Sequence, residues 1–309
     1  MLLLQDKKQR EKILAVCKSI ERSHGEGAIY SLGSEKANMK IPRFSTYIED
    51  LDHILGGGIP KGRIIEVYGA ESSGKTSLAL HLCGLHEMAL YVDAEGTFEA
   101  DRARIFGNRP KQLIVYRPEY GEDALDRVNE FIKAGIPFIA IDSVPALMPK
   151  EDYDKVDKTI ENELRIGGVA RLLNKTLPVL HREIEKTGTT VLFINQVRDK
   201  MNAMLFGEKT DTPGGKALKF YSSVRIQVGR RSWIEVPNKD PRNSASNEKI
   251  GLITKCKVTK SKVCNPYGEA EISMIFDRGY VSHEDAVAIR KEIMENNRKR
   301  KIKGKIEEE

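Results

Sequence analysis

The octapeptide Gly69-Ala70-Glu71-Ser72-Ser73-Gly74-Lys75-Thr76 decides the fold of this 309-residue chain. It matches the pattern G-x-x-x-x-G-K-[ST] at every constrained position, and it lies between an apolar run and a segment of helical spacing. A loop of this kind turns successive backbone N–H groups toward an anion, and the following helix N-terminus adds positive potential. The sequence therefore predicts a nucleoside-triphosphate site, for ATP or GTP.

Each residue of this loop has an expected task in holding the nucleotide. Lys75 is expected to neutralise the β- and γ-phosphates, and the Thr76 hydroxyl to ligate Mg²⁺. The predicted metal ligands are Thr76 and Asp142. The predicted nucleotide contacts are Gly69, Ala70, Glu71, Ser72, Ser73, Gly74, Lys75, Thr76, Ser77 and Asp142.

Outward from this loop, short apolar runs alternate with segments of helical spacing. The runs are residues 64–68, 89–92, 113–116, 137–141 and 190–194. Such alternation predicts crossover connections and a largely parallel sheet buried on both faces. Beyond Phe220, partly alternating runs predict an antiparallel extension. These runs are residues 224–228, 251–258 and 271–276. The expected fold class is α/β.

Polar residues follow several of the apolar runs, at the edge where open α/β sheets bind ligands. Asp142 is expected to hold a Mg²⁺-bound water, and Glu95 to orient or deprotonate an attacking water. Gln196 is expected to sense the γ-phosphate. The alternative for each carboxylate is a helix cap, but three polar strand ends beside such a loop favour a hydrolytic site. We interpret Asp93 as structural.

Composition excludes some classes of protein and leaves others open. With 40% hydrophobic and 31% charged residues, the chain resembles an ordinary soluble globular protein. No apolar run reaches the roughly 18 residues of a membrane span, so we expect a cytoplasmic protein without a membrane partner. Four cysteines without metal-ligand spacing indicate reduced thiols. The net charge of +6 permits a polyanionic partner, and the basic run 298–305 is either a solvated tail or a nucleic-acid contact.

Taken in order, these stretches resemble the RecA recombinases of bacteria and their phage-encoded relatives. The matching segments are residues 62–76, 93–95, 141–147, 193–198, 214–225, 260–263 and 269–271. Their order and spacing hold from about residue 5 to residue 280. The loop at 69–76 alone would indicate only the P-loop superfamily. The block Gly214–Arg225 is specific to a much narrower group of proteins.

The resemblance implies a P-loop NTPase with a RecA-type core. That core would span residues 44–280 and carry the DNA-binding loops. Residues 1–43 would form an N-terminal helix and linker that contact a neighbouring protomer. Residues 281–309 would form a short C-terminal helix with a basic and acidic tail.

The resemblance also implies a DNA-dependent ATPase that uses ATP and Mg²⁺. The protein would form a helical homo-oligomeric filament on single-stranded DNA and pair that strand with homologous duplex DNA. The implied catalytic residues are Lys75, Glu95, Gln196, Lys260 and Lys262, the two last reaching the neighbouring protomer's phosphates. Lys219 and Phe220 would lie at the interface. Without the resemblance, the residues alone favour the alternative that Lys260 and Lys262 are exposed strand lysines.

Two loops, about 161–168 and 197–212, match the family's DNA-binding loops. The implied DNA contacts are Arg171, Arg198, Lys200, Met204, Phe206, Lys209, Gly214 and Gly215. Basic residues would contact phosphates, and apolar ones would insert between bases. The alternative is a mobile surface loop. The sequence departs from the family's pattern in the segment expected to contact the adenine base, where Arg102 stands in place of the usual aromatic residue.

Two other functions fit parts of the sequence. One is an ATP-gated recombination mediator, or adaptor, without strand-exchange activity, which the presence of Glu95 and the lysine pair disfavours. The other is a hexameric motor of the same fold, which would lack the Gly214–Arg225 block in this form.

Overall fold

The protein is described by a computed structural model that covers residues 7–25, 28–34, 40–158, 167–199, 210–238 and 247–307. Two compact units divide the chain, Met1–Pro42 and Arg43–Glu309. The first unit contains the helix α1 (Lys7–His24). Its apolar residues Ile13 and Leu14 are about half exposed, at 45% and 52%. The predicted N-terminal helix is therefore present, with an apolar surface open to solvent.

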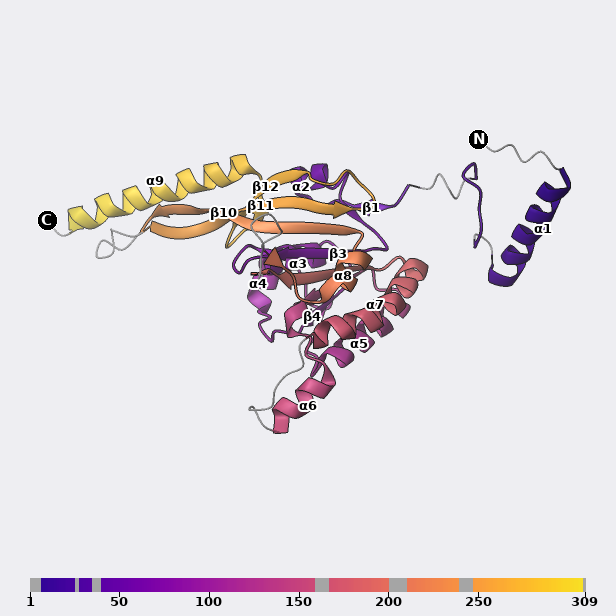
Figure 1. Cartoon of the computed structure of the whole chain (residues 1–309). Helices are drawn as coiled ribbons and strands as arrows, with labels where there is room; N and C mark the ends of the chain where they lie inside the picture. The colour runs from indigo at the N-terminus through magenta and orange to yellow at the C-terminus, as the bar shows by residue number, and fades with distance from the viewer. Residues whose placement is uncertain are drawn as a thin grey trace. The chain divides into compact units, whose positions relative to one another are not determined.

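The second unit is built on a nine-stranded sheet, in the order β13-β12-β11-β10-β3-β7-β6-β4-β5 (Figure 1). Its parallel part consists of β3 (Ile64–Gly69), β7 (Thr190–Gln196), β6 (Phe138–Asp142), β4 (Ala89–Asp93) and β5 (Leu113–Tyr116). β10 (Val224–Pro237) joins β3 in parallel. The antiparallel part continues through β11 (Asn247–Ser261), β12 (Glu269–Ile275) and β13 (Gly279–Val281). The predicted α/β class and antiparallel extension are confirmed.

Helices cover both faces of the parallel strands, which explains why these strands are almost wholly apolar. β4 and β6 are buried along their full length. One core cluster packs α3 (Lys75–Gly84) against the sheet, through residues such as Leu78 and Leu82. The other packs α5 (Gly121–Lys133) and α7 (Gly168–Thr187) on the opposite face. A strand buried on both faces reads as a continuous hydrophobic run.

The remaining elements complete the described chain. They are β1 (Arg43–Phe44), α2 (Glu49–Ile54), β2 (Ile59–Pro60), α4 (Ala100–Ile105), η2 (Val144–Ala146), α6 (Lys150–Lys158), β8 (Arg198–Asp199), β9 (Thr210–Asp211), α8 (Gly215–Tyr221) and α9 (His283–Glu307). Among the residues described, no helix combines the length and the apolar character needed to cross a membrane. All four cysteines are free thiols; Cys83 and Cys256 are buried, whereas Cys17 and Cys264 are half-buried.

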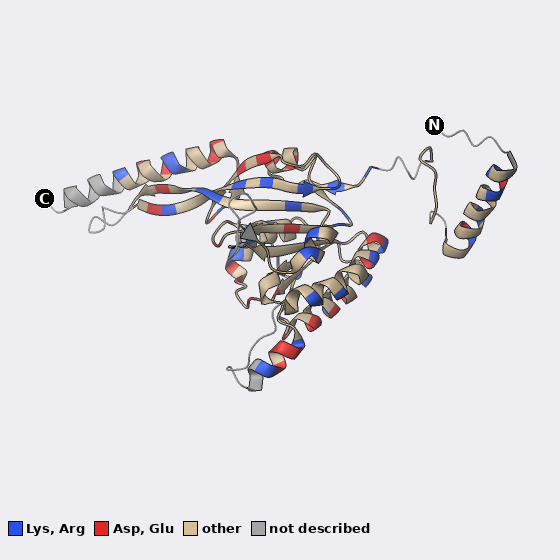
Figure 2. Cartoon of the chain, viewed as in Figure 1, with Lys and Arg blue, Asp and Glu red and all other residues tan. Residues whose placement is uncertain are grey.

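The expected limits of two strands were wrong, because β10 and β11 extend well beyond residues 228 and 251. The extra length forms a ribbon along which α9 lies (Figure 1). Ile234 and Ile275 pack there against Ala286 and Ile289 of α9. Charged residues of both signs recur along this ribbon and interrupt its apolar alternation (Figure 2). That interruption concealed the strands from a reading based on periodicity.

Candidate functional site

The carboxyl ends of four neighbouring parallel strands form the candidate site. β3 runs directly into the phosphate loop, and its last residue, Gly69, lies opposite Gln196 of β7. Asp142 of β6 lies opposite Asp93 of β4. Because parallel strands end at the same edge of a sheet, residues far apart in sequence meet here, as the sequence predicts.

The phosphate loop is held in shape by its own backbone and by the antiparallel part of the sheet. Gly74 precedes α3 with a φ of 90°, a left-handed conformation that a side chain would strain. The Ser73 hydroxyl donates to the carbonyl of Ala70 at 2.7 Å. From β11, the Thr254 hydroxyl donates to the carbonyl of Ser73 at 3.2 Å. These hydrogen bonds fix the conformation of the loop.

Lys75 carries a desolvated positive charge within this loop. Its side chain is 9% exposed, and its ammonium donates to the carbonyls of Gly69 at 3.1 Å and Ala70 at 2.6 Å. Burial lowers the pKa of Lys75, while the nearby carboxylates of Asp142 and Glu95 act in the opposite direction. A buried cation bonded to neutral carbonyls is suited to binding a polyphosphate.

Thr76 and Asp142 form a pair of oxygen ligands beside Lys75. The Thr76 hydroxyl donates to Oδ2 of Asp142 at 2.7 Å, and the Tyr91 hydroxyl donates to the same oxygen at 2.6 Å. Burial raises the pKa of Asp142, and the charge of Glu95 raises it further, whereas the two hydroxyl donors lower it. Hydroxyl and carboxylate oxygens are hard ligands of the kind that Mg²⁺ prefers. These residues therefore fit a magnesium-bound nucleotide.

Glu95 and Gln196 meet next to this pair. The Ser143 hydroxyl donates to Oε1 of Glu95, and Nε2 of Gln196 lies 3.5 Å from the same oxygen. The backbone N–H of Glu95 donates to the carbonyl of Asp142 at 3.2 Å. Asp93, in contrast, accepts the N–H groups of the turn at residues 97–98 and the guanidinium of Arg117. Its contacts agree with the structural interpretation.

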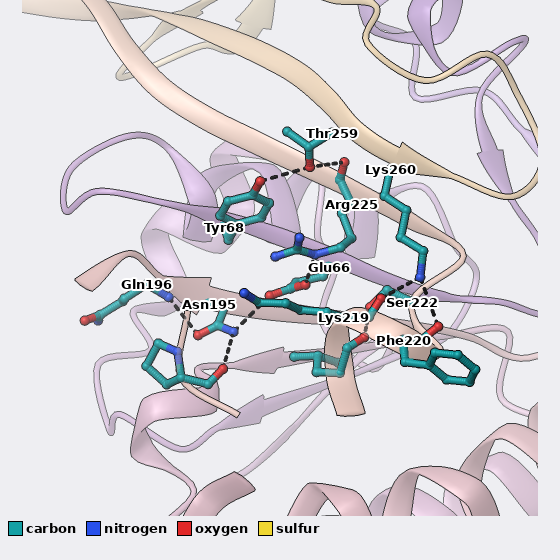
Figure 3. A network of polar contacts seen from close by, with 12 residues as sticks. Glu66, Tyr68, Asn195, Gln196, Lys219, Phe220, Ser222, Arg225, Thr259 and Lys260 are labelled. Atoms are coloured by element: carbon teal, nitrogen blue, oxygen red, sulfur yellow. Dashed lines mark hydrogen bonds and ion pairs between the residues drawn. The ribbon is translucent and has the colours of Figure 1, made fainter. Parts of the chain in front are cut away.

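Lys260 and Lys262 lie together at another place. The Lys260 ammonium donates to the carbonyls of Lys219 at 2.5 Å and Phe220 at 3.0 Å, the last turn of α8 (Figure 3). The Lys262 ammonium lies 5.4 Å from the ring centroid of Phe220. Burial and the charges of Lys262 and Arg225 lower the pKa of Lys260 to about 8. The sequence predicts functional roles for all four residues, and the structure brings Lys260 and Lys262 against Lys219 and Phe220 in the last turn of α8.

The model for the RecA N-terminal domain matches residues 11–281 of the chain. The chain belongs to the RecA family. It is 37% identical over 283 residues to a protein named RecA from Nitratidesulfovibrio vulgaris, a match that covers 90% of this chain and 75% of that relative. It is 39% identical over 280 residues to RecA of Staphylococcus aureus strain JH9, covering 87% and 76%. The resemblance inferred from the motifs is confirmed.

A cavity of about 490 Å³ beside the phosphate loop contains residues that sequence reasoning missed. Its lining comes from the loop, from α4 and from the antiparallel strands: Ser72, Gly74, Ser77, Glu99, Asp101, Arg102, Ile105, Phe106, Trp233, Leu252, Met274 and Phe276. The Arg102 guanidinium donates to the Ser77 hydroxyl at 2.9 Å. Trp233 and Phe276 make an edge-to-face pair, with ring centroids 6.2 Å apart.

The only sequence signal for this aromatic wall was composition. Trp233 is the single tryptophan of the chain, and it lies beyond the strand limit that periodicity predicted. Two cations lie over its ring, Arg230 at 4.7 Å and Lys249 at 4.6 Å from the centroid. Phe276, directly after β12, is 42% exposed. The wall therefore offers apolar surface next to the phosphate loop.

The predicted DNA-contacting residues are described only in part. Lys200, Met204, Phe206 and Lys209 lie outside the described residues, as do residues 159–166 of the first loop. At the base of the second loop, Arg198 of β8 pairs with Asp211 of β9. Gly214 has a φ of 89°, and a Cβ there would lie 2.8 Å from Leu173 of α7. Gly215 begins α8, and Arg171 is exposed on the first turn of α7.

Proposed function

We propose that this chain hydrolyses ATP in a pocket that is completed by a neighbouring protomer of the same filament. As a member of the RecA family, the chain is an ATP-dependent recombinase and a DNA-dependent ATPase. Family membership favours this function over that of an adaptor without strand exchange. The proposal concerns the nucleotide and which residues act on it, within one protomer and between protomers.

Within one protomer, the loop residues 69–77 would hold the triphosphate, with Lys75 opposite its negative charge. Thr76 and Asp142 would hold the magnesium ion. Magnesium-bound ATP supplies the phosphoryl group that is transferred to water. Glu95 would accept a proton from that water, and the Ser143 hydroxyl would keep the Glu95 carboxylate in place. Gln196 reaches Glu95 from β7 and would respond to the terminal phosphate.

The proposal rests on the position of Lys260 and Lys262. Lys260 donates to carbonyls of α8, and Lys262 lies over Phe220, so neither lysine is used by the phosphate loop of its own protomer. Phe220 is 69% exposed, which leaves this cluster on the surface. Cations that face outward can be offered to a neighbouring protomer, where they would stabilise developing negative charge.

The rate of ATP hydrolysis as a function of protein concentration tests this proposal. With single-stranded DNA present, specific activity should rise steeply with concentration, because each active pocket needs two protomers. Without DNA, dilute protein should bind ATP yet hydrolyse it slowly. Equal specific activity in dilute, DNA-free and monomeric protein would contradict a shared pocket.

We further propose that the filament forms on single-stranded DNA and pairs it with homologous duplex DNA. β8 begins two residues after Gln196, the last residue of β7, which supports assigning the segment between β8 and β9 to the single-stranded DNA. Electron microscopy with a slowly hydrolysed ATP analogue and single-stranded DNA should show helical filaments. Closed rings would favour a motor, and isolated protomers would favour an adaptor.

The exposed apolar side of α1 supports a contact with the adjacent protomer. Ile13, Leu14 and Val16 are all about half exposed within the first unit. Replacing Leu14 by Asp should shorten the filaments without reducing ATP binding by the protomer. Filaments of unchanged length would remove α1 from the assembly contact.

A further inference from the structure

Glu66 is a carboxylate at the centre of the sheet with no exposure to solvent. It lies on β3, between β10 and β7, three residues before the phosphate loop begins at Gly69. A buried carboxylate is costly unless each oxygen has a donor. Oε1 accepts the side-chain amide of Asn195 at 2.9 Å, and Oε2 accepts the guanidinium of Arg225 at 2.5 Å. We call these three residues the buried relay (Figure 3).

Asn195 joins the buried relay to both ends of the second loop. Its amide nitrogen also donates to the carbonyl of Pro213 at 2.8 Å, directly before the glycines that begin α8. Its amide oxygen accepts the backbone N–H of Gln196 at 3.0 Å. Asn195 is fully buried, so these partners fix its orientation. A shift of Gln196 would therefore move Asn195 and disturb its hydrogen bond to Pro213, directly before α8.

Arg225 joins the buried relay to the strand that carries Lys260. On β10 it lies opposite Glu66 of β3 on one side and Lys260 of β11 on the other. Its guanidinium lies 4.5 Å from the ring centroid of Tyr68, and the Tyr68 hydroxyl donates to Thr259. The Arg225 side chain is only 13% exposed. Because both charges are desolvated, their bond is strongly directional.

Helix α8 is consequently held at two points that meet at Glu66. Before its first turn, Asn195 holds the carbonyl of Pro213. At its last turn, Lys260 holds the carbonyls of Lys219 and Phe220, and Lys260 is positioned by the strand paired with Arg225. Hydrogen bonds thus lead from Gln196 through Asn195 and Glu66 to Arg225, and strand pairing leads from Arg225 to Lys260.

We propose that Glu66, Asn195 and Arg225 are positioning residues that couple the nucleotide pocket to the DNA loop and to the lysine pair. This inference rests on the proposed function. The relay touches neither nucleotide nor DNA; it sets how strongly the presence of one changes the affinity for the other. Such coupling is reciprocal, so it is measured from either ligand.

The test compares the affinity for fluorescein-labelled oligothymidine with and without a slowly hydrolysed ATP analogue and Mg²⁺. In Glu66→Gln, the affinity for each ligand alone should match that of the unchanged protein. The ratio of the DNA affinity with the ATP analogue to the DNA affinity without it should fall about tenfold. The reason is that the neutral amide cannot accept from Asn195 and Arg225 in the same arrangement. ATP affinity measured with and without the oligonucleotide should lose the same factor.

Asp52→Asn provides the matched control for loss of stability. Asp52 of α2 accepts the backbone N–H and the hydroxyl of Thr46, so this variant also removes the charge of a hydrogen-bonded carboxylate. It lies outside the relay and should lower Tm without changing the affinity ratio. Arg225→Lys keeps the positive charge and is the second variant, to be used if Glu66→Gln does not fold.

Three outcomes are distinguishable. A reduced ratio in Glu66→Gln or Arg225→Lys, with separate affinities intact, supports the relay. An unchanged ratio in a variant with the same lowered Tm as Asp52→Asn shows that the three residues serve stability only, and overturns the proposal. A ratio of one in the unchanged protein contradicts the proposed function itself.

Discussion

The parallel and antiparallel parts of the sheet prepare their charged residues in opposite ways. At the edge of the parallel part, Lys75, Asp142 and Glu95 converge on one phosphate loop. In the antiparallel part, the Lys260 ammonium donates instead to the carbonyls of Lys219 and Phe220 in α8. Under the proposed function, one part is complete within a single protomer, whereas the other acts on a second molecule. This division gives a physical reason for hydrolysis to depend on assembly.

The strongest test of the comparison mixes two inactive variants. Lys260→Ala should reduce ATP hydrolysis in filaments at least about 10³-fold, the effect of removing a cation supplied in trans. Lys75→Ala should be similarly inactive because its own loop is impaired. Mixed together, the two should recover part of the activity, since the intact loop of one protomer would meet the intact lysines of the other.

Steady-state hydrolysis with single-stranded DNA is the measurement, at a fixed total protein concentration. Recovery should be greatest near equal proportions. No recovery at any proportion, with filaments still visible, would place all the cations within one protomer and remove the distinction between the two parts.

Glu95→Gln tests the parallel part alone. The amide keeps the shape of the side chain but cannot accept a proton, so turnover should fall about 10²- to 10⁴-fold while ATP binding and filament formation persist. Isothermal titration with the ATP analogue and electron microscopy measure the retained properties. Unchanged turnover would remove Glu95 from the mechanism.

Phe276→Ala tests whether the antiparallel part also contributes to the pocket of its own protomer. Loss of the exposed ring beside the phosphate loop should weaken ATP binding about tenfold, because aromatic contacts contribute about 0.5–1.5 kcal/mol beyond their buried area. Fluorescence of Trp233, the single tryptophan, should change when ATP binds to the unchanged protein. Tyr267→Ala, at a ring 71% exposed outside this cavity, is the control and should bind normally.

Asp142→Asn gives the smallest effect, on the stability of the nucleotide-free protein. Because the pKa of Asp142 is raised in the folded state, the native protein binds more protons than the unfolded chain just above the ordinary carboxyl pKa. Stability from this group is therefore present at low pH and lost as pH rises through the folded-state pKa. At neutral pH the neutral amide should raise Tm by about 2–4 °C.

Scanning calorimetry without nucleotide measures that change. A lower Tm in Asp142→Asn would indicate that the ionised carboxylate is stabilised by Thr76 and Tyr91 more than burial disfavours it. The same comparison at acidic pH, where Asp142 is protonated in both states, should show almost no difference between variant and unchanged protein.

The polar residues at the carboxyl edge of the parallel strands could be predicted from the sequence, because the topology of the sheet brings them together. Asp142 and Gln196 follow buried strands, and parallel strands place such residues at one edge whatever the intervening loops do. No comparable rule places Lys260 against α8, since its partners Lys219 and Phe220 are brought there by packing. The resemblance named these residues without indicating where their side chains rest in the protomer.

The full lengths of β10 and β11 and the contacts of Glu66 could not be predicted from hydrophobic periodicity, for different reasons. The ends of β10 and β11 carry charges on exposed faces, and their apolar side packs on α9, which lies elsewhere in the sequence. Glu66 was visible as a charge within the apolar run 64–68, yet its significance depends on Asn195 and Arg225 from other strands. A buried charge inside a central strand is a signal worth following whenever its partners can be sought.

The burial of the four cysteines determines how readily their thiols react. Thiolate is the form that reacts with alkylating reagents. Burial raises the pKa of Cys83, and raises that of Cys256 to about 12, so both remain almost wholly protonated at neutral pH. A maleimide dye should therefore react first at the half-buried Cys17 and Cys264. In a Cys264→Ser variant it would label α1 alone, and its emission would report directly when that helix finds a partner.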